Sequence, residues 1–242
     1  MSAKIITIEG TDCSGKETQS KILEQRLLLE GYKVKRHSFP KYETATGKII
    51  GGSYLGKPEI GECLFTEGAV NVDPIVASLY YAADRRYAFL NEIERDIEEN
   101  DVVILDRYTS SNLGHQGSKI SNLDKQNRFF ELITLLESEV CELPLSDVTI
   151  FLHMPLEAAK ILKGNREHLD QHELSESHLR HAENTYLLLQ QKYNWKYINC
   201  IKGVFNGVES IKNPNEIHEE IFNEIKELLS KDTKEVLKMT RF

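Results

Sequence analysis

The sequence predicts an α/β fold in which a parallel sheet is covered by helices on both faces. Short β-branched runs alternate along the chain with longer segments whose apolar residues recur at helical spacing, which is typical of strand–helix–strand units. The runs at 101–105 (DVVIL) and 147–153 (DVTIFLH) are mostly apolar, as expected of parallel strands buried on both faces. The chain has 242 residues with neither an internal repeat nor a low-complexity linker, so we expect a single domain over 1–242.

In the first half of the chain, two strands and two helices are expected. The run at 4–9 (KIITIE) is rich in β-branched residues and predicts the first strand. The first helix is expected at 16–30, where isoleucine and leucine recur at helical spacing until a glycine follows. The second strand is expected at 33–39, before a proline. A long helix is expected at 73–97, because aspartate and proline suit its first turn and an apolar stripe follows.

In the second half, the strand at 101–105 comes first and a helix is expected at 123–140. The remaining elements are the strand at 147–153, a short helix from 155, a helix at 174–193, a strand at 196–200 and an amphipathic helix at 215–230. The stretches 47–72 and 164–173 fit neither pattern. Such segments in α/β enzymes often cover the substrate.

Charge and composition exclude several classes of protein. The formal net charge is −8, which argues against nucleic-acid or anionic-membrane binding because those partners require a surface rich in Lys and Arg. No run approaches the roughly 18 apolar residues of a membrane span. The four cysteines are widely spaced and form no C-x-x-C pair, as in cytosolic proteins with reduced thiols. We therefore expect a cytoplasmic protein with no nucleic-acid or membrane partner.

A phosphate-binding loop is predicted between the first strand and the first helix. Residues 10–16 read GTDCSGK and match the pattern G-x-x-x-x-G-K in the structural context that this motif requires. In such a loop, backbone N–H groups surround a phosphate and the helix N-terminus adds partial positive charge. The candidate ATP contacts span 10–18 and are Gly10, Thr11, Ser14, Gly15, Lys16, Glu17 and Thr18.

The residue after Lys16 departs from this motif. A serine or threonine usually places its hydroxyl on Mg²⁺ at that position, but this chain has Glu17. Thr18 is no simple substitute, because one helical residue turns a side chain by about 100°. Three interpretations compete: Glu17 holds the ion directly or through water, the ion is held elsewhere, or activity is lost. Asp12 and Asp106 are nearby carboxylates, and we rank relocation of the metal contact first.

A second constellation follows the strand at 101–105. Asp106, Arg107 and Tyr108 stand at the carboxyl end of the predicted sheet, where ligands bind. The planar guanidinium of Arg107 can contact two phosphates at once, although an Asp–Arg pair that caps a helix is the structural alternative. Tyr81 and Arg85 share one face of the long helix. They can stack on a base and donate to its carbonyl or, with equal weight, pack in the core.

Together these motifs resemble those of the thymidylate kinases, in the P-loop nucleoside-monophosphate kinase group. The family's loop pattern E-G-x-D-x-x-G-K begins here at Glu9. The other family motifs follow in order as Phe39-Pro40, Asp84-Arg85, Asp106-Arg107-Tyr108 with Ser111, and His115-Gln116-Gly117. The resemblance covers about residues 4–202. It implies a three-layer P-loop NTPase fold, with a parallel five-stranded sheet flanked by helices, a mobile lid and a homodimer.

The resemblance also implies an activity, which is phosphoryl transfer from ATP to thymidine 5′-monophosphate (dTMP) with Mg²⁺. Arg107 would bridge the donor and acceptor phosphates, and Lys41 or Tyr42 would hold the acceptor phosphate. Asp12 would lie near the metal or the acceptor sugar. In an acceptor region at about 39–85 and just beyond the strand at 101–105, the implied pocket comprises Phe39, Tyr81 stacked on thymine, Arg85 on its carbonyl, Asp106, Tyr108, Ser111, Asn112, His115 and Gln116.

Three positions depart from the family pattern. Relatives usually carry an arginine at or near position 42, where this chain has Tyr42 with Lys41 as the adjacent cation. His115 stands where tyrosine is common, which bears on sugar selectivity. The phosphate loop has no basic residue before Lys16, so an arginine from a lid at about 163–174 is implied. Arg166 is the candidate, and it completes an expected catalytic set with Lys16, Arg107 and Asp12.

Two other functions compete with this reading. A deoxynucleoside kinase acting on thymidine would need a carboxylate base near the sugar hydroxyl, and Glu43 is the only carboxylate close to the end of the second strand. A monophosphate is already an anionic nucleophile, so positioning and charge neutralisation suffice for it. This comparison favours the nucleotide acceptor. A non-catalytic nucleotide-binding protein is the other alternative, and it rests on Glu17.

Overall fold

The centre of the computed structural model is a five-stranded parallel sheet with the order β2-β3-β1-β4-β5. The structure describes residues 2–163, 175–205 and 208–239. The strands are β1 (Lys4–Gly10), β2 (Val34–Ser38), β3 (Val102–Asp106), β4 (Val148–His153) and β5 (Lys196–Asn199). All five predicted strands are confirmed to within about two residues at each end.

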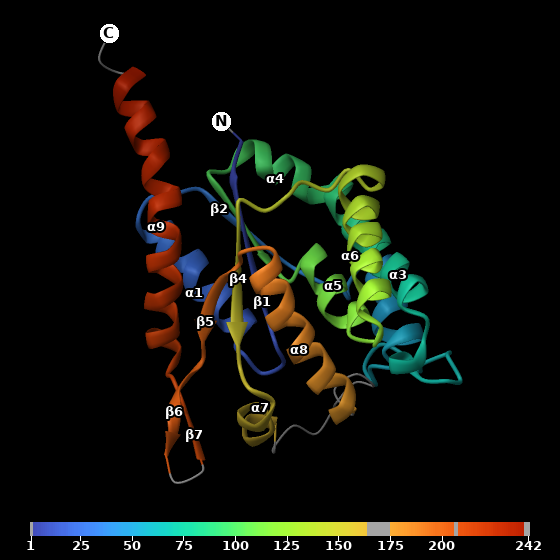
Figure 1. Ribbon diagram of the computed structural model, residues 1–242. Coiled ribbons are helices and arrows are strands. Elements are labelled where there is room, and N and C mark those ends of the chain that lie inside the picture. Colours follow the sequence, from blue (N-terminus) through green and yellow to red (C-terminus); the bar gives the residue numbers. More distant parts are fainter. Residues whose placement is uncertain (1, 164–174, 206–207, 240–242) are drawn as a thin grey trace.

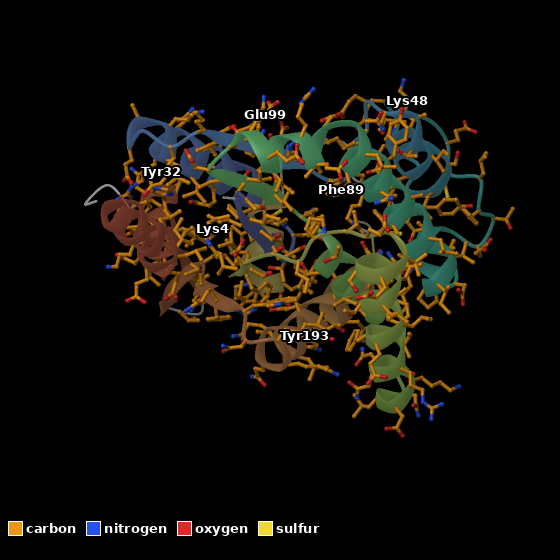
Figure 2. The ribbon with its side chains drawn as sticks, turned by 90° about the horizontal axis from the view of Figure 1, so that it is seen from above. Lys4, Tyr32, Lys48, Phe89, Glu99 and Tyr193 are labelled. Carbon is orange, nitrogen blue, oxygen red and sulfur yellow. The ribbon has the colours of Figure 1, made fainter. Side chains whose placement is uncertain are left out.

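Helices cover both faces of this sheet, which gives the expected three layers (Figure 1). On one face lie α1 (Lys16–Leu29) and α9 (Pro214–Met239), and on the other lie α5 (Thr109–Gly117), α6 (Leu123–Leu135) and α8 (Glu176–Lys192). Figure 2, viewed from above, shows Lys4 at the start of β1 between Tyr32 on the side of α9 and Phe89 on the side of α3. The fold class is confirmed.

The remaining elements connect these layers. They are α2 (Ala45–Lys48), the π-helix η1 (Ile49–Tyr54), the 3₁₀ turn η2 (Ala69–Asn71), α3 (Pro74–Ala88), the π-helix η3 (Phe89–Ile93), α4 (Glu94–Glu99), the π-helix η4 (Leu136–Val140) and α7 (Leu156–Lys163). The predicted helix at 73–97 therefore corresponds to α3, η3 and α4 in succession. In the described ranges, no helix is long and apolar enough to cross a membrane.

Two apolar cores lie above and below the sheet. Ile6 and Ile8 of β1 pack with Leu23 and Leu27 of α1 and with Ile221 of α9 in the larger core, whose other members include Ile104, Ile150, Leu152 and Ile225. The alternate residues of β1 and β3, namely Ile5, Val103 and Leu105, face a second core with Phe39 and Tyr108. Strands buried on both faces explain their continuous apolar runs.

The sequence patterns missed some local structure. The stretch 47–72 contains η1 and η2, and a small antiparallel hairpin of β6 (Ile201–Phe205) and β7 (Val208–Ile211) follows β5. The last helix begins as predicted but runs to Met239 rather than ending at 230. The predicted lid at 163–174 lies outside the described residues, apart from Lys163 at the end of α7.

Helix α5 was also missed, although it carries several candidate site residues. Its sequence TSSNLGHQG holds serines, an asparagine and two glycines, which are weak helix formers. Tertiary packing explains the helix. A Cβ on Gly114 would lie 2.4 Å from Cζ of Tyr186 in α8, and one on Gly117 would lie 2.5 Å from Cε1 of Phe130 in α6. The glycines therefore let α5 approach α6 and α8 closely.

Candidate functional site

The phosphate loop is held in shape by its own backbone and by β4. Gly15 precedes α1 with φ 80°, a left-handed conformation that suits glycine. A Cβ on Gly10 would lie 2.6 Å from the carbonyl oxygen of Leu152, so only glycine fits there. The Thr11 hydroxyl donates to the Met154 carbonyl at 2.7 Å and accepts from the Met154 N–H at 2.9 Å. The loop is thereby tied to the end of β4.

Lys16 lies folded over this loop. Its ammonium donates to the carbonyl oxygens of Gly10 at 3.0 Å and Thr11 at 2.7 Å, and the side chain is buried. Burial first, and then the charge of Arg107, lower the pKa of Lys16 to about 8, against the opposing effect of Asp12 and other nearby carboxylates. The cation is therefore held beside the loop backbone by hydrogen bonds to carbonyl oxygens.

The buried carboxylate of Glu9 joins the phosphate loop to the segment after β3. Its Oε1 accepts from the backbone N–H of Tyr108 and from the hydroxyls of Ser110 and Ser111, each at 2.9 Å. The Tyr186 hydroxyl lies 3.3 Å from Oε2. The sequence analysis identified Glu9 only as the first residue of the family's loop pattern and predicted no role for its side chain. The structure shows that it positions the loop on which Arg107 stands.

Arg107 itself adopts a rare backbone conformation, with φ 63°. A positive φ is uncommon outside glycine and recurs at functional sites. The turn presents the guanidinium to Asp12, with 3.8 Å between Nη2 and Oδ1, and to His115, with 3.4 Å between Nη1 and Nε2. Asp106 is buried beside the turn and accepts from Ser38 Oγ at 3.4 Å. Arginine and carboxylates thus converge beside the phosphate loop.

A pocket opens next to Arg107 and encloses about 770 Å³ of non-atom space out to its mouth. We call it the acceptor pocket. It is lined by Asp12, Phe39, Pro40, Tyr42, Leu55, Lys57, Tyr81, Arg85, Arg107, Ser111, Asn112, His115 and Gln116.

One end of the acceptor pocket is built on a buried ion pair. Arg85 of α3 donates through Nε to Glu137 Oε2 at 2.5 Å and through Nη2 to Oε1 at 2.7 Å. Both side chains are almost fully buried. Burial alone would lower the pKa of Arg85, but the Glu137 carboxylate outweighs it and raises that pKa, so the guanidinium stays charged. The bidentate pair fixes the plane of the guanidinium.

Asn112 of α5 completes this end. Its Nδ2 donates to Glu137 Oε1 at 2.7 Å and to the Ser78 carbonyl at 3.2 Å. Because both partners are acceptors, the NH₂ group must face them, and the orientation of the amide follows from chemistry. Its Oδ1 is buried and has no hydrogen-bond partner among the described residues. A buried acceptor without a partner is costly, because it has lost its hydrogen bonds to water without a replacement.

Asp84, the first residue of the Asp-Arg motif, holds the segment that follows β2. Its carboxylate accepts from the Lys41 backbone N–H at 2.9 Å and from the Thr46 hydroxyl at 2.8 Å. The motif therefore combines an acid that anchors the neighbouring loop with an arginine, Arg85, that faces the pocket. The two neighbouring residues of the motif thus have different roles, one in anchoring a loop and one in the pocket.

Most residues expected around the acceptor are brought together in the acceptor pocket. Lys41 is not among its lining residues. Its ammonium contacts Glu92 at 2.6 Å and His37 Nδ1 at 3.1 Å, and its side chain is buried. Tyr108 packs against Phe39 in the second core, with 6.1 Å between ring centroids. Neither of these two side chains lines the acceptor pocket.

The predicted metal and lid residues are distributed differently. Glu17 is 70% exposed and pairs with Lys21, and Thr18 is exposed. Asp12 and Asp106 lie beside the phosphate loop, where both influence the Lys16 ammonium. In the part of the chain that the structure describes, no group of three or more His, Cys, Asp or Glu side chains could by itself hold a metal ion. Arg166 lies outside the described residues.

Lys57 is a pocket residue that the sequence analysis missed. It lines the acceptor pocket, and its ammonium lies 5.1 Å from the centre of the Tyr42 ring. Lys57 comes from the stretch 47–72, which showed no periodicity, and its approach depends on the turn at Gly56 with φ 63°. No signal in the sequence distinguishes it from any other lysine.

Comparisons with known proteins agree with this geometry. The thymidylate kinase family model matches residues 8–211. The chain is 31% identical over 214 residues to the thymidylate kinase of Prochlorococcus marinus, covering 88% of this chain and 95% of that protein. It is 28% identical over 206 residues to the probable thymidylate kinase of Caldivirga maquilingensis, covering 85% of this chain and 90% of that protein.

Solved structures support the fold. The thymidylate kinase of Candida albicans superposes with a TM-score of 0.68 at 23% identity, covering 93% of this chain and 92% of that one. The match to the family model over most of the chain, together with the relatives, establishes the assignment. The chain belongs to the thymidylate kinase family, and its activity is the ATP-dependent phosphorylation of dTMP.

Proposed function

We propose that the acceptor pocket selects dTMP by reading the edge of its base with Asn112 and Arg85. The observation that carries this proposal is the buried, unpaired Oδ1 of Asn112 in the pocket wall beside the guanidinium of Arg85. Thymine presents an N3–H donor next to the O4 acceptor. Asn112 Oδ1 accepts from N3–H, and the Arg85 Nη1 group, which makes no hydrogen bond within the described chain, donates to O4.

Cytosine reverses this pattern, because its N3 is an acceptor and its amino group is a donor. In the pocket, the N3 lone pair of cytosine would face the Asn112 Oδ1 acceptor, and the cytosine amino group would face the donors of the Arg85 guanidinium. Each buried polar group left without a partner costs about 1–3 kcal/mol, and sites built on such contacts discriminate strongly. The proposed pocket therefore rejects dCMP and accepts both thymine and uracil at this edge.

The phosphate of the acceptor lies, in this proposal, between Arg107 and Lys57, with the Tyr42 hydroxyl beside them. Arg107, Lys57 and Arg85 are the lysine and arginine side chains that line the pocket. Arg85 is neutralised by Glu137, and Lys41 contacts Glu92. A dianionic phosphate needs nearby cations, and this end of the pocket supplies them. Lys57 thus takes the role that the sequence suggested for Lys41.

The residues beside the phosphate loop fit a magnesium ion held mainly by ligands other than the protein. Mg²⁺ commonly binds through one or two carboxylates, substrate phosphates and water. Asp12 and Asp106 offer two carboxylates, and the structure brings them close to Lys16. We propose that they hold the ion through its waters. Bound with ATP, Mg²⁺ neutralises charge on the β- and γ-phosphate oxygens.

The protein's own part in the transfer is positioning and charge stabilisation. Lys16 and the loop N–H groups hold the donor phosphates, and Arg107 stands where it can contact the phosphoryl group as its charge spreads. The acceptor phosphate is anionic, so no general base is required. Arg166 keeps the role that the family resemblance implies for it.

We further propose that the chain is a homodimer. Helices α3 and α6 lie beside each other in Figure 1, and α3 is joined to η4, which continues α6, by Arg85–Glu137 and by the Arg86 contact to the Cys141 carbonyl at 2.9 Å. These helices and the segments η3 and η4 that continue them expose several large apolar side chains, which are Ile75, Leu79, Tyr87, Leu90, Leu132, Leu135 and Val140. Apolar patches of this kind mark interfaces. Leu79→Glu should give monomers by light scattering, whereas Leu29→Glu on α1 should leave dimers.

The other general features are proposed on simpler grounds. A single sheet contains strands from both halves of the chain, which supports one domain over 1–242. All four cysteines are free, which supports a cytoplasmic location. The acidic charge supports a protein with no nucleic-acid or membrane partner.

A substrate panel tests the base-reading proposal. With ATP and Mg²⁺ in a coupled assay, kcat/KM should be highest for dTMP, lower for dUMP, and lower than for dTMP by about 100-fold or more for dCMP. Thymidine, which has no phosphate for Arg107 and Lys57, should not turn over. Equal kcat/KM for dTMP and dCMP would refute the proposed base contacts. Turnover of thymidine would instead favour a nucleoside kinase.

A further inference from the structure

We propose that Glu137 is a specificity-determining residue of this kinase, which acts by fixing how Arg85 and Asn112 present themselves to the base. The inference rests on the proposed roles of those two residues in reading the base. Glu137 stands in η4, distant in sequence from both, and it is not among the residues that line the acceptor pocket. It is therefore a positioning residue rather than a catalytic one.

The Glu137 carboxylate receives donors from two helices at once. Oε2 accepts from Arg85 Nε at 2.5 Å, and Oε1 accepts from Arg85 Nη2 at 2.7 Å and from Asn112 Nδ2 at 2.7 Å. Its side chain is 2% exposed. A carboxylate offers only acceptors, so all three contacts require that donors face it. The Glu137 carboxylate therefore sets the donor and acceptor direction of every hydrogen bond that it makes.

For Arg85, the consequence is a fixed guanidinium. The bidentate contact commits Nε and one N–H of Nη2, so the remaining donors turn away from Glu137. The same contact neutralises a cation that is 1% exposed, which would otherwise be strongly destabilising in the interior. Arg85 therefore presents an oriented hydrogen-bond donor to a neutral base, and its charge is balanced by Glu137.

For Asn112, the consequence concerns which end of the amide faces the pocket. A side-chain amide can exchange its oxygen and nitrogen by rotating half a turn, and its surroundings decide between the two states. Glu137 holds Nδ2 at 2.7 Å, while the Ser78 carbonyl is a second and longer acceptor at 3.2 Å. Glu137 is therefore the stronger of the two groups that keep Oδ1 directed away from them, as an acceptor for N3–H.

Replacement of Glu137 by glutamine changes this logic with little change in shape. Glutamine has one oxygen and one NH₂ group. With its oxygen at the Oε1 position, glutamine still accepts from Asn112 Nδ2 but turns its NH₂ group toward the Nε–H donor of Arg85. With its oxygen at the Oε2 position, its NH₂ group faces the donors of Arg85 Nη2 and Asn112 together. Both arrangements set donor against donor at Arg85 and free its guanidinium, and the second also drives the Asn112 amide to turn over. Its Nδ2 would then meet the base, which suits the N3 acceptor of cytosine. The preference for dTMP over dCMP should decrease even if only part of the Asn112 amide population turns over.

A purely structural role for Glu137 predicts something else. Loss of a buried carboxylate would then lower stability and reduce turnover of every monophosphate by the same factor. The ratio of kcat/KM for dTMP to that for dCMP separates the two roles, because a common factor cancels from it. The KM for ATP provides a second internal reference, since the phosphate loop lies apart from this network.

The experiment compares Glu137→Gln, Glu137→Asp and the matched control Glu139→Gln, which changes an exposed residue of the same short segment. In Glu137→Gln, the dTMP/dCMP ratio should fall by about 10-fold or more, while the KM for ATP changes by less than about 2-fold. Glu137→Asp keeps the charge but shortens the reach, so its ratio should be intermediate. Glu139→Gln should match the original protein.

Each result decides the question. An unchanged dTMP/dCMP ratio in folded Glu137→Gln overturns the inference. If that variant does not fold, Glu137→Asp decides alone, and an unchanged ratio there overturns it equally. The unsubstituted protein distinguishes failure of this inference from failure of the proposed function on which it rests. If the unsubstituted protein does not discriminate between dTMP and dCMP, the proposed base contacts are refuted. If it does distinguish them and the variants do too, only the role of Glu137 fails.

Discussion

The two ends of the active site are constructed in opposite ways. The phosphate end is made largely from consecutive residues, because the loop between β1 and α1 binds through backbone groups and through Lys16. The base end is made from side chains that are far apart in sequence: Glu137 follows Arg85 by 52 positions and Asn112 by 25. Affinity for phosphate is thus a local property of the chain, whereas selectivity for a base is a property of its packing.

The charges of the two ends differ for a related reason. At the phosphate end, Arg107 lies 3.8 Å from Asp12 and Lys16 donates to carbonyl oxygens, so neither cation is held in a bidentate ion pair. At the base end, Glu137 binds Arg85 bidentately, so the pocket presents hydrogen-bond groups without net charge. An anion is attracted by uncompensated charge, while a neutral base is selected by the direction of its donors and acceptors.

The largest expected effect comes from removing the cation shared by both phosphates. Arg107→Ala should lower kcat by about 10³-fold, because its charge acts mainly on the transferring group. The KM for ATP should change only a few-fold, since Lys16 and the loop remain. Steady-state kinetics measure both quantities, and Arg107→Lys, which keeps the charge without the planar fork, should recover part of the rate. An unchanged kcat would remove Arg107 from the transfer step.

Lys57→Ala should produce the next largest effect, and it is confined to the acceptor. We expect the KM for dTMP to rise roughly 10-fold with little change in the KM for ATP, because one contact to a charged phosphate is lost. Lys48→Ala is the control, since Lys48 is exposed and lies at the edge of the molecule in Figure 2. If the KM for dTMP does not move, Lys57 has no part in binding the phosphate.

The lowered pKa of Lys16 predicts a pH dependence at the phosphate end alone. Its pKa of about 8 lies below the ordinary value because burial disfavours the charged form, so the ammonium is present below pH 8 and is lost as pH rises through 8. The KM for ATP should therefore increase above pH 8 by up to about tenfold per pH unit. A KM for ATP that stays constant to pH 10 would contradict this. The dTMP/dCMP ratio should not follow the same curve.

The smallest effect is expected at Glu17. Its carboxylate is exposed and pairs with Lys21 on the surface of α1, and such pairs contribute about 0.3–0.5 kcal/mol. Glu17→Gln should shift the Mg²⁺ concentration for half-maximal activity by less than about 2-fold. Asp106→Asn should shift it by about 10-fold or more. A large shift in Glu17→Gln would place the metal contact on the helix after all.

Sequence patterns were most informative where structure depends on neighbouring residues. The strand that ends at Gly10, the loop that follows it and the helix that starts at Lys16 could all be expected, because periodicity and glycine geometry act over a few residues. Helix α5 could not be expected from TSSNLGHQG, since its stability comes from close packing of Gly114 against Tyr186. The positions of the Lys41 and Lys57 ammonium groups likewise could not be expected from sequence patterns.

These two lysines also explain why motifs alone misplace a cation. Lys41 adjoins the Phe39-Pro40 motif, yet its ammonium turns to Glu92 and His37. Lys57 belongs to no motif, yet the fold of η1 and the turn at Gly56 bring it to the pocket. A motif specifies which residues lie on one segment. The direction of a long side chain depends on which opposite charges the rest of the chain places around it.

The amino-acid sequence by itself determined the succession of the five strands of the central sheet along the chain, the phosphate loop and the family to which the ordered motifs belong. The tertiary structure alone decided which atoms face the base: that Glu137 meets Arg85 and Asn112, and that Oδ1 rather than Nδ2 of Asn112 is left without a partner in the described chain. The physical reason is range. Backbone periodicity and turn geometry act between neighbours in sequence, whereas hydrogen-bond polarity in a buried site is set by groups that only folding brings together.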